Sequence, residues 1–281
     1  MTVVVGVQTT DGLVFASDSA TTQQLMTVGG DLRTTAIWNS ANKIFNLRRT
    51  WPVGAMTFGN ASVGGLSIAT LAKDLRLQFE GKIPTPLVSA LDPATYTVQE
   101  VASGLQVFFR DRYDASAATG DLGFIVGGFS SGSDHPEMWQ VMILDTGADV
   151  VQEVLPPSET GIVHQGMTDA ITRLMDGASQ DLGAALEKHG VPAGSGEGIA
   201  EMLRGELSMT WAWPGMPLGE TIDMAKFLVD TQINFIRFMP GDAIVGGPVE
   251  IAALTKHEGF KWVRRKHYFS HKLNPNEDVI A

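Results

Sequence analysis

The stretch that decides the fold is the first one, Met1-Thr2-Val3-Val4-Val5-Gly6-Val7, whose β-branched run predicts a strand. It is followed by Gln8-Thr9-Thr10-Asp11-Gly12, in which the Asp-Gly pair is typical of a tight hairpin turn. Residues 13–16 then read as the returning strand, and Asp18 comes directly after it. We therefore expect Asp18 to lie near the end of the ribbon that starts at Thr2.

Thr2 has a chemical meaning of its own. A small residue at position 2 is the condition for removal of the initiator Met1, and the mature chain would then begin with a threonine. Such a residue carries a hydroxyl nucleophile and, in its own α-amine, a general base with a pKa of roughly 7.7–8.0. The alternative reading is an ordinary processed terminus.

Composition narrows the class of protein. The chain has 281 residues, 44% of them hydrophobic, which is enough to bury a core, and it lacks an apolar run long enough for a membrane span. The N-terminus has no basic region followed by an apolar stretch, so no secretory signal is expected and the cytoplasm is the predicted location. The absence of cysteine excludes disulfides, thiolate metal sites and cysteine nucleophiles. A net charge of −11 argues against nucleic acid and anionic membranes as partners.

The rest of the chain alternates between strand pairs and helix pairs. Residues 19–42 read as an irregular arm with a Gly-Gly turn. The later elements follow from apolar spacing and turn residues. Strands are expected at about 43–47, 51–58, 123–129, 138–144, 161–164, 248–255 and 260–264. Helices are expected at about 66–79, 97–113, 165–175 and 221–238, with short helical pieces inside 176–220.

This order predicts an α+β fold, in which two antiparallel sheets pack together between helix pairs as a four-layer αββα sandwich. The competing architecture is a parallel βαβαβ sheet, which needs one helix between successive strands, whereas the helices here come in pairs. We expect a single domain over residues 2–281, with an insertion at about 176–220 and a tail after about 265.

With these elements in this order, the chain resembles the proteasome-type β-subunit family of N-terminal-nucleophile hydrolases over nearly its whole length. Within that family it looks closest to the bacterial proteasome homologues, relatives of the HslV peptidase and of the ancestral β-subunit-like proteins. The matching motifs, quoted as they stand here, are Thr2-Val3-Val4-Val5-Gly6, Ala16-Ser17-Asp18-Ser19-Ala20-Thr21-Thr22, Lys43-Ile44-Phe45, Gly59, and Asp242-Ala243-Ile244-Val245-Gly246-Gly247.

The resemblance implies a role for each matching residue. Thr2 would be the nucleophile, and Lys43 a fixed positive charge that lowers the pKa of its amine. Asp18 would hold Lys43, because a charge withdrawn from water is costly unless it is paired. The N–H of Gly59 would help to form the oxyanion hole, and Asp242 would support the site. For Lys43, Asp18 and Gly59 the alternative is structural: a strand-edge lysine, a turn or capping aspartate and a turn glycine. Asp242 lacks the serine partner that the family pattern gives it.

The chain departs from the family pattern at two supporting serines. Gln165 stands in the Gly-Ser-Gly element, within His164-Gln165-Gly166, and Val245 stands three residues after Asp242. Glutamine can still hydrogen-bond and valine cannot. The two changes bear on catalytic efficiency more than on the fold.

Other motifs predict no chemistry. His164, His267 and His271 show no metal-ligand spacing, and no Gly-x-Ser-x-Gly element supports a serine triad. The glycine-rich stretch 194–198 lacks the Lys-Ser/Thr ending of a phosphate loop. Trp211 and Trp213 read as a core or interface patch. No metal and no cofactor are expected.

The predicted function is a threonine-type peptidase. Loss of Met1 would expose the nucleophile Thr2, and a ring of subunits would enclose the sites. An extended peptide or unfolded protein would pair with edges near residues 19–22 and 57–60. The expected contact residues are Ser19, Thr21, Thr22 and Thr57. By the resemblance, the chain would form a homo-oligomer as a stacked double ring, with an ATP-dependent unfoldase as a candidate partner. Two alternatives stay open: a non-catalytic ring scaffold of the same fold, and an amidase acting on small molecules.

Overall fold

The computed structural model describes residues 2–26 and 32–266, and its two main sheets lie face to face at the centre. Each sheet has five strands, and all its neighbouring strands are antiparallel. The first sheet has the order β12 (Gly161–Gly166), β1 (Val3–Thr9), β2 (Gly12–Ser17), β13 (Glu250–Thr255) and β14 (Gly259–Arg264). The second has the order β11 (Val150–Leu155), β10 (Glu137–Ile143), β9 (Leu122–Gly128), β6 (Val53–Gly59) and β5 (Ile44–Asn46).

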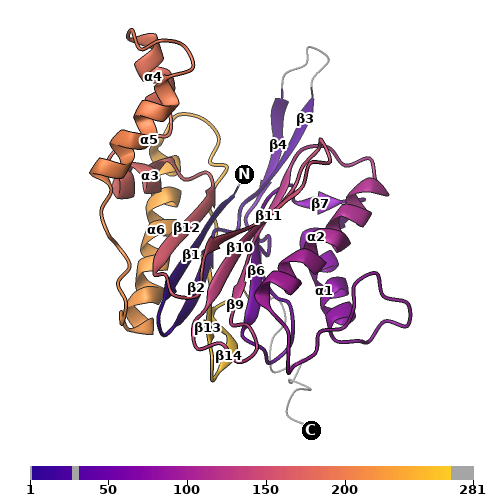
Figure 1. The fold of residues 1–281 in the computed structure, drawn as a ribbon. Coiled ribbons are helices and arrows are strands. Elements are labelled where there is room, and N and C mark those ends of the chain that lie inside the picture. Colours follow the sequence, from indigo (N-terminus) through magenta and orange to yellow (C-terminus); the bar gives the residue numbers. More distant parts are fainter. Residues whose placement is uncertain (1, 27–31, 267–281) are drawn as a thin grey trace.

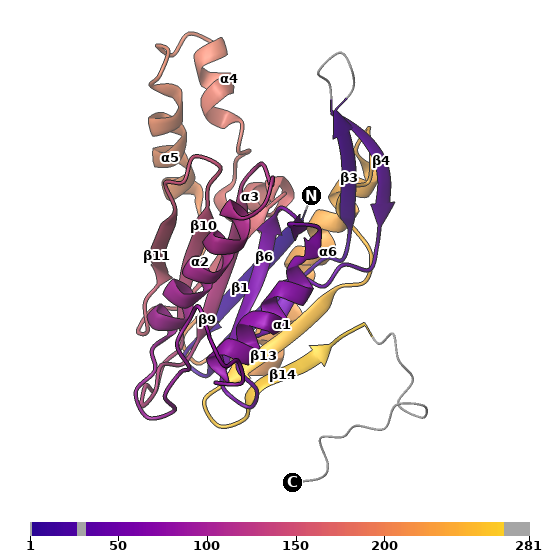
Figure 2. The same ribbon diagram turned by 90° about the vertical axis from the view of Figure 1, so that its right-hand side faces the viewer.

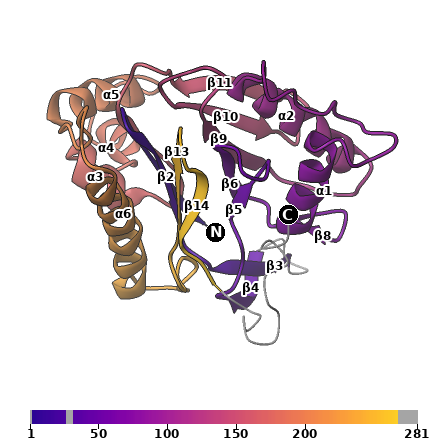
Figure 3. The same cartoon turned by 90° about the horizontal axis from the view of Figure 1, so that it is seen from below.

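Helices cover the outer face of each sheet, and the four layers are seen edge-on in Figure 3. The second sheet is covered by α1 (Ile68–Phe79) and α2 (Val98–Asp114). The first is covered by α6 (Leu218–Phe238), with α3 (Asp169–Asp176) beside it. Ser67 and Thr97 cap the amino ends of α1 and α2 with their hydroxyl groups, as serine and threonine commonly do. The predicted αββα sandwich is confirmed.

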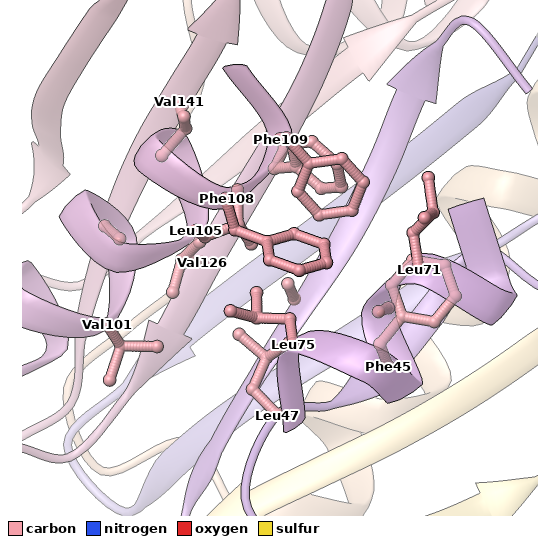
Figure 4. Close-up of a cluster of buried hydrophobic side chains, with 14 of the residues drawn as sticks. Phe45, Leu47, Leu71, Leu75, Val101, Leu105, Phe108, Phe109, Val126 and Val141 are labelled. Carbon is pink, nitrogen blue, oxygen red and sulfur yellow. The ribbon is translucent and has the colours of Figure 1, made fainter. Parts of the chain in front are cut away.

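Three apolar clusters fill the spaces between the layers. The first lies between α1, α2 and the second sheet, and its aromatic centre is formed by Phe108, Phe109 and Phe124. Figure 4 shows side chains of this cluster converging from the two helices and the strands beneath them. The second cluster joins α6 to the first sheet, and the third fills the space between the sheets. Because β1 and β2 are packed on both faces, every residue of both strands is buried.

Residues 19–42 were predicted as an irregular arm, and that prediction is wrong. They contain β3 (Thr21–Met26) and β4 (Leu32–Trp38), a two-stranded antiparallel ribbon that extends from one end of the sandwich (Figures 1 and 2). Threonine recurs in both strands and favours extended backbone, a preference that the prediction of an irregular arm did not take into account. The expected Gly29-Gly30 turn lies outside the described residues.

One further strand and the start of one helix differ from expectation. The sequence reading missed β11, an edge strand that is only partly buried and so lacks a strong apolar signal. Residues 165 and 166 end strand β12, and the helix expected there begins at Asp169.

The short pieces expected within 176–220 are α4 (Leu182–Lys188) and α5 (Gly196–Leu207), which pack on each other and project from the end of the sandwich (Figure 1). A small hairpin, β7 (Ser62–Val63) and β8 (Leu66–Ser67), precedes α1. In the described part of the chain, no helix is long and apolar enough to cross a membrane.

Candidate active site at the start of β1

Thr2 lies immediately before β1, a central strand of the first sheet, and is 7% exposed. Its carbonyl oxygen accepts a hydrogen bond from the N–H of Met167 at 2.7 Å. Gly166 sits against the same carbonyl with a φ of +88°, and a Cβ there would lie 2.0 Å from the Thr2 oxygen. A side chain at position 166 would therefore push Thr2 away, so the glycine at the end of β12 fixes where the backbone of Thr2 lies.

Asp18 follows β2 and is completely buried, and its carboxylate receives four hydrogen bonds. Oδ1 accepts from the N–H of Val3 at 3.0 Å and from Nζ of Lys43 at 2.6 Å. Oδ2 accepts from the N–H of Ala20 at 3.0 Å and of Gly246 at 3.1 Å. The predicted neighbourhood of Asp18 and the start of β1 is present, because Val3 is the residue next to Thr2. Three backbone amides and one ammonium compensate the buried negative charge.

Lys43 precedes β5 and is 4% exposed, so its ammonium has little contact with water. Burial lowers the pKa of Lys43 below the ordinary value of a lysine, and the charge and hydrogen bond of Asp18 oppose that shift. Two further charges reach it: the positive Lys266 lowers the pKa and the negative Glu250 raises it. The site therefore places a cation of reduced proton affinity at the start of β1.

Thr2, Lys43 and Gly59 line one cavity of about 370 Å³. Gly59 ends β6 with a φ of +83°, and a Cβ there would lie 2.4 Å from the carbonyl oxygen of Asp121. The turn thus requires glycine, whether or not its N–H takes part in chemistry. Thr57 lines the same cavity, donating its N–H to the carbonyl of Lys43 at 2.9 Å and its hydroxyl to that of Gly123 at 3.2 Å. The two sheets each contribute part of this wall.

The three expected contact residues after Asp18 have different environments. Thr21 lines the cavity. Ser19 is fully buried, and its backbone N–H and C=O bind Gly246 and Ala41, so neither is available to a substrate strand. Its hydroxyl donates to the carbonyl of Pro248 and accepts from Lys266. Thr22 follows Thr21 on β3, and successive side chains of a strand point to opposite faces. The side chain of Thr22 therefore points to the other face of the strand from that of Thr21.

Over the described ranges of the chain, neither Asp242 nor the two positions that depart from the family pattern form a hydrogen bond with Thr2. Asp242 is exposed, and within residues 2–26 and 32–266 its carboxylate makes no hydrogen bond or ion pair. Val245 is 2% exposed and packs in the cluster between α6 and the first sheet. Gln165 lies on β12 opposite Val4. The loop of residues 241–247 instead contributes a backbone amide, that of Gly246, to Asp18.

Sequence reasoning missed Glu250 and Lys266, which form a buried ion pair behind Ser19. A signal was present in the sequence, since Glu250 interrupts the apolar run Pro248-Val249-Glu250-Ile251-Ala252 on an expected strand. A charged residue at such a position is rarely buried unless it has a partner. No pattern pointed to Lys266 as that partner, because the pairing depends on how β14 ends.

None of the remaining candidates that fall within the described residues lines the cavity. His164 is on β12, and burial lowers its pKa. His267 and His271 lie outside the described residues. Trp211 stacks on Phe227 of α6 and Trp213 is exposed. Among residues 2–26 and 32–266, no cluster of three His, Asp or Glu side chains could hold a metal ion.

Two antiparallel sheets between helix layers form an αββα sandwich of the N-terminal-nucleophile-hydrolase type. No protein-family model and no curated protein matches the sequence.

Solved structures do match, and three of them are structures of Anbu, an ancestral β-subunit. A Gly-1 mutant of Anbu from Hyphomicrobium sp. strain MC1 is 16% identical, with a TM-score of 0.50 over 95% of this chain and 86% of that one. Anbu from Yersinia bercovieri is 12% identical over 95% and 88%, with a TM-score of 0.49. A helical assembly of the Anbu complex from Pseudomonas aeruginosa is 15% identical over 97% and 90%, also with a TM-score of 0.49. At these identities the likeness concerns the fold, and a closer relation to the HslV peptidase stays a prediction.

Proposed function

We propose that the protein is a threonine-type N-terminal-nucleophile peptidase whose mature chain begins at Thr2. The observation that supports it best is the convergence of Thr2, Lys43 and Gly59 on one cavity, with Asp18 fixing Lys43 from behind. A chain that retains Met1 carries an amide nitrogen at Thr2, which cannot serve as a base. Removal of Met1 is thus part of the proposal.

In the proposed reaction the α-amine of Thr2, through a water molecule, takes the proton of the Thr2 hydroxyl as Oγ attacks a peptide carbonyl. The N–H of Gly59 stabilises the oxyanion, and the proton passes to the leaving amine as the C–N bond breaks. An ester to Thr2 forms, and a second water hydrolyses it. The positive charge of Lys43 favours the neutral amine and the developing alkoxide.

We propose that the substrate is an extended peptide lying along Thr21 and Thr57, the two expected contact residues that line the cavity. Ser19 and Thr22 would not touch the peptide and would contribute by supporting the residues around them. Among the residues that the structure describes, Asp242 forms no hydrogen bond or ion pair through its carboxylate that would support a part in the chemistry. Assembly of the chain into a closed homo-oligomer, with an unfoldase as partner, is proposed from the sequence resemblance. The Anbu complex of Pseudomonas aeruginosa, for its part, forms a helical assembly.

A non-catalytic scaffold is the second candidate, and Val245 favours it. Its burial in the α6 cluster shows a position used for packing where the family pattern has a supporting serine. A small-molecule amidase is the third, because a cavity of about 370 Å³ is within the size of small-molecule sites.

Covalent labelling tests the proposal. We expect purified protein to lack Met1 by intact-mass spectrometry, and a threonine-directed β-lactone or epoxyketone to add one equivalent of mass. Thr2→Ala should give no adduct while keeping the wild-type unfolding temperature, because the substitution removes one hydroxyl and one methyl. Retention of Met1 would end the peptidase proposal. Processing without adduct or peptide turnover would favour the scaffold, and turnover of small amides but not peptides the amidase.

The pH dependence of labelling should be bell-shaped. The rate is expected to rise as the α-amine loses its proton, with a midpoint at or below about 8. It should fall again as Lys43 loses its charge. Burial lowers the pKa of Lys43, so this alkaline limb should lie below the ordinary lysine value of about 10.4. The second-order rate of adduct formation, measured by mass from about pH 6 to 10.5, gives both limbs. A rate still at its plateau at the upper end of that range would contradict the role of Lys43.

A further inference from the structure

A second buried ion pair lies directly behind the proposed site. Glu250, at the start of β13, is 1% exposed, and Lys266, just after β14, is 8% exposed. The Lys266 ammonium is 3.0 Å from Oε2 of Glu250, and the backbone N–H of Lys266 donates to Oε1 at 3.2 Å. Glu250 thus holds both the charge and the backbone of Lys266 at the end of the first sheet.

The Lys266 ammonium joins the segments that contain Ser19, Ala41 and Glu250. It donates to the hydroxyl of Ser19 and, at 2.7 Å, to the carbonyl of Ala41. Ser19 in turn donates to Pro248, and the N–H of Ala41 donates to the carbonyl of Ser19 at 3.0 Å. The ammonium thus makes two hydrogen bonds, to Ser19 and Ala41, and an ion pair with Glu250.

These segments carry the residues of the proposed site. Ser19 is next to Asp18, and Ala41 is two residues before Lys43. A displacement of either segment would therefore change the 2.6 Å contact between Asp18 and Lys43, on which the charge at Thr2 depends. Misplacement of a reacting group by about 1 Å can cost roughly a hundredfold in rate.

We propose that Lys266, anchored by Glu250, is a positioning residue that locks the segments bearing Asp18 and Lys43 in their reactive arrangement. The proposal rests on the threonine-peptidase function proposed above. It assigns a part in the site to the end of the described chain, far in sequence from Thr2.

A structural tie alone would not need charge. Removing two ions from water is expensive, and apolar pairs of similar volume often stabilise a fold as well or better. The charges of this pair also reach Lys43, which is faced by Asp18 from β2, Glu250 from β13, Lys266 from the end of β14 and the proposed amine of Thr2. Lys266 lowers the pKa of Lys43 and Glu250 raises it, so the pair has an effect that a steric tie lacks.

The test is the rate of β-lactone addition to Thr2 across pH in the full-length protein. Lys266→Met is expected to lower the rate at pH 8 by about tenfold or more. Its alkaline limb should move to higher pH, because the repulsion between Lys266 and Lys43 is gone while Glu250 still raises the pKa of Lys43. Lys266→Arg keeps the charge and should keep the limb within about 0.3 pH units of wild type, whatever its rate. The matched control is Lys256→Met, at an exposed lysine that follows β13 and pairs with Asp134. It should change neither rate nor limb.

The outcomes separate this inference from the function on which it rests. If wild-type protein forms no adduct, both are overturned. If wild type reacts and Lys266→Met reacts at the same rate with the same alkaline limb, only the inference is overturned. If Lys266→Met fails to fold, Ser19→Ala takes its place. That variant removes one acceptor of the ammonium and leaves both charges, so a slower rate with an unmoved limb supports the inference and an unchanged rate overturns it.

Discussion

Lys43→Met is expected to lower the rate of covalent labelling at Thr2 by about 10²–10³-fold while the protein stays folded. The substitution removes the positive charge from the cavity and keeps an unbranched side chain of similar length. Asp18 loses one of four donors and retains the N–H groups of Val3, Ala20 and Gly246, so its carboxylate still has hydrogen bonds in the core. Stability should also fall, because Asp18 keeps a buried charge without its counter-ion, but its three remaining N–H donors limit that loss.

The measurement is the second-order rate of β-lactone addition, followed by intact mass alongside thermal unfolding. Lys73→Met, at a lysine on the exposed side of α1, is the control for loss of a positive charge from an acidic protein. A Lys43→Met protein that labels within about threefold of wild type would remove Lys43 from the proposed machinery.

The sandwich could be predicted because its elements carry local signals. The β-branched run at the start, the Asp-Gly turn and the apolar spacing of α1, α2 and α6 each agree with the final structure. Local signals that agree with one another are typical of natural folds. The ribbon of β3 and β4 was missed because polar threonines and glutamines make extended backbone without an apolar period.

The site was predicted less completely than the fold, and the reason is geometric. Asp18 and Lys43 meet through a hairpin and the packing of two sheets, and the pairing followed from motifs whose order in the chain is informative. Gly166 and Gly246 contribute through their backbones. Gly166 lies close to the carbonyl of Thr2, and Gly246 donates its N–H to Asp18. Backbone contacts of this kind cannot be predicted from the residue type. The position of Lys266 depends on the course of the backbone after the end of β14. Contacts of this kind join segments that are distant in the sequence. They arise from the tertiary structure, so no single stretch of sequence predicts them.

Asp18→Asn is expected to cost about 3–5 kcal/mol of stability at neutral pH, the usual loss when one partner of a buried ion pair is removed. The amide of asparagine has one acceptor oxygen, whereas both oxygens of Asp18 accept hydrogen bonds. The N–H groups of Ala20 and Gly246, which bind Oδ2, would then face an NH₂ group. Lys43 would keep its burial and lose the charge that compensates it.

The same change fixes the sign of a pH effect. Asp18 raises the pKa of Lys43, so its removal lowers that pKa further. Between the lowered pKa and the ordinary lysine value of about 10.4, the unfolded chain binds the proton and the folded chain does not, so stability rises with pH in that interval. The deficit of Asp18→Asn relative to wild type should accordingly shrink as pH rises toward 10, measured by denaturant unfolding at several pH values.

The matched control is Asp230→Asn, which breaks the half-exposed pair between Lys226 and Asp230 on α6. An exposed pair of this kind is worth about 0.5 kcal/mol or less, since water solvates either partner left alone. Equal losses for the two variants would mean that the pair of Asp18 and Lys43 is solvated in solution. A lysine so placed could not act as a fixed, partly desolvated charge beside Thr2. A large loss for Asp18→Asn alone would instead tie the stability of the first sheet to the same contact that is proposed to tune the nucleophile.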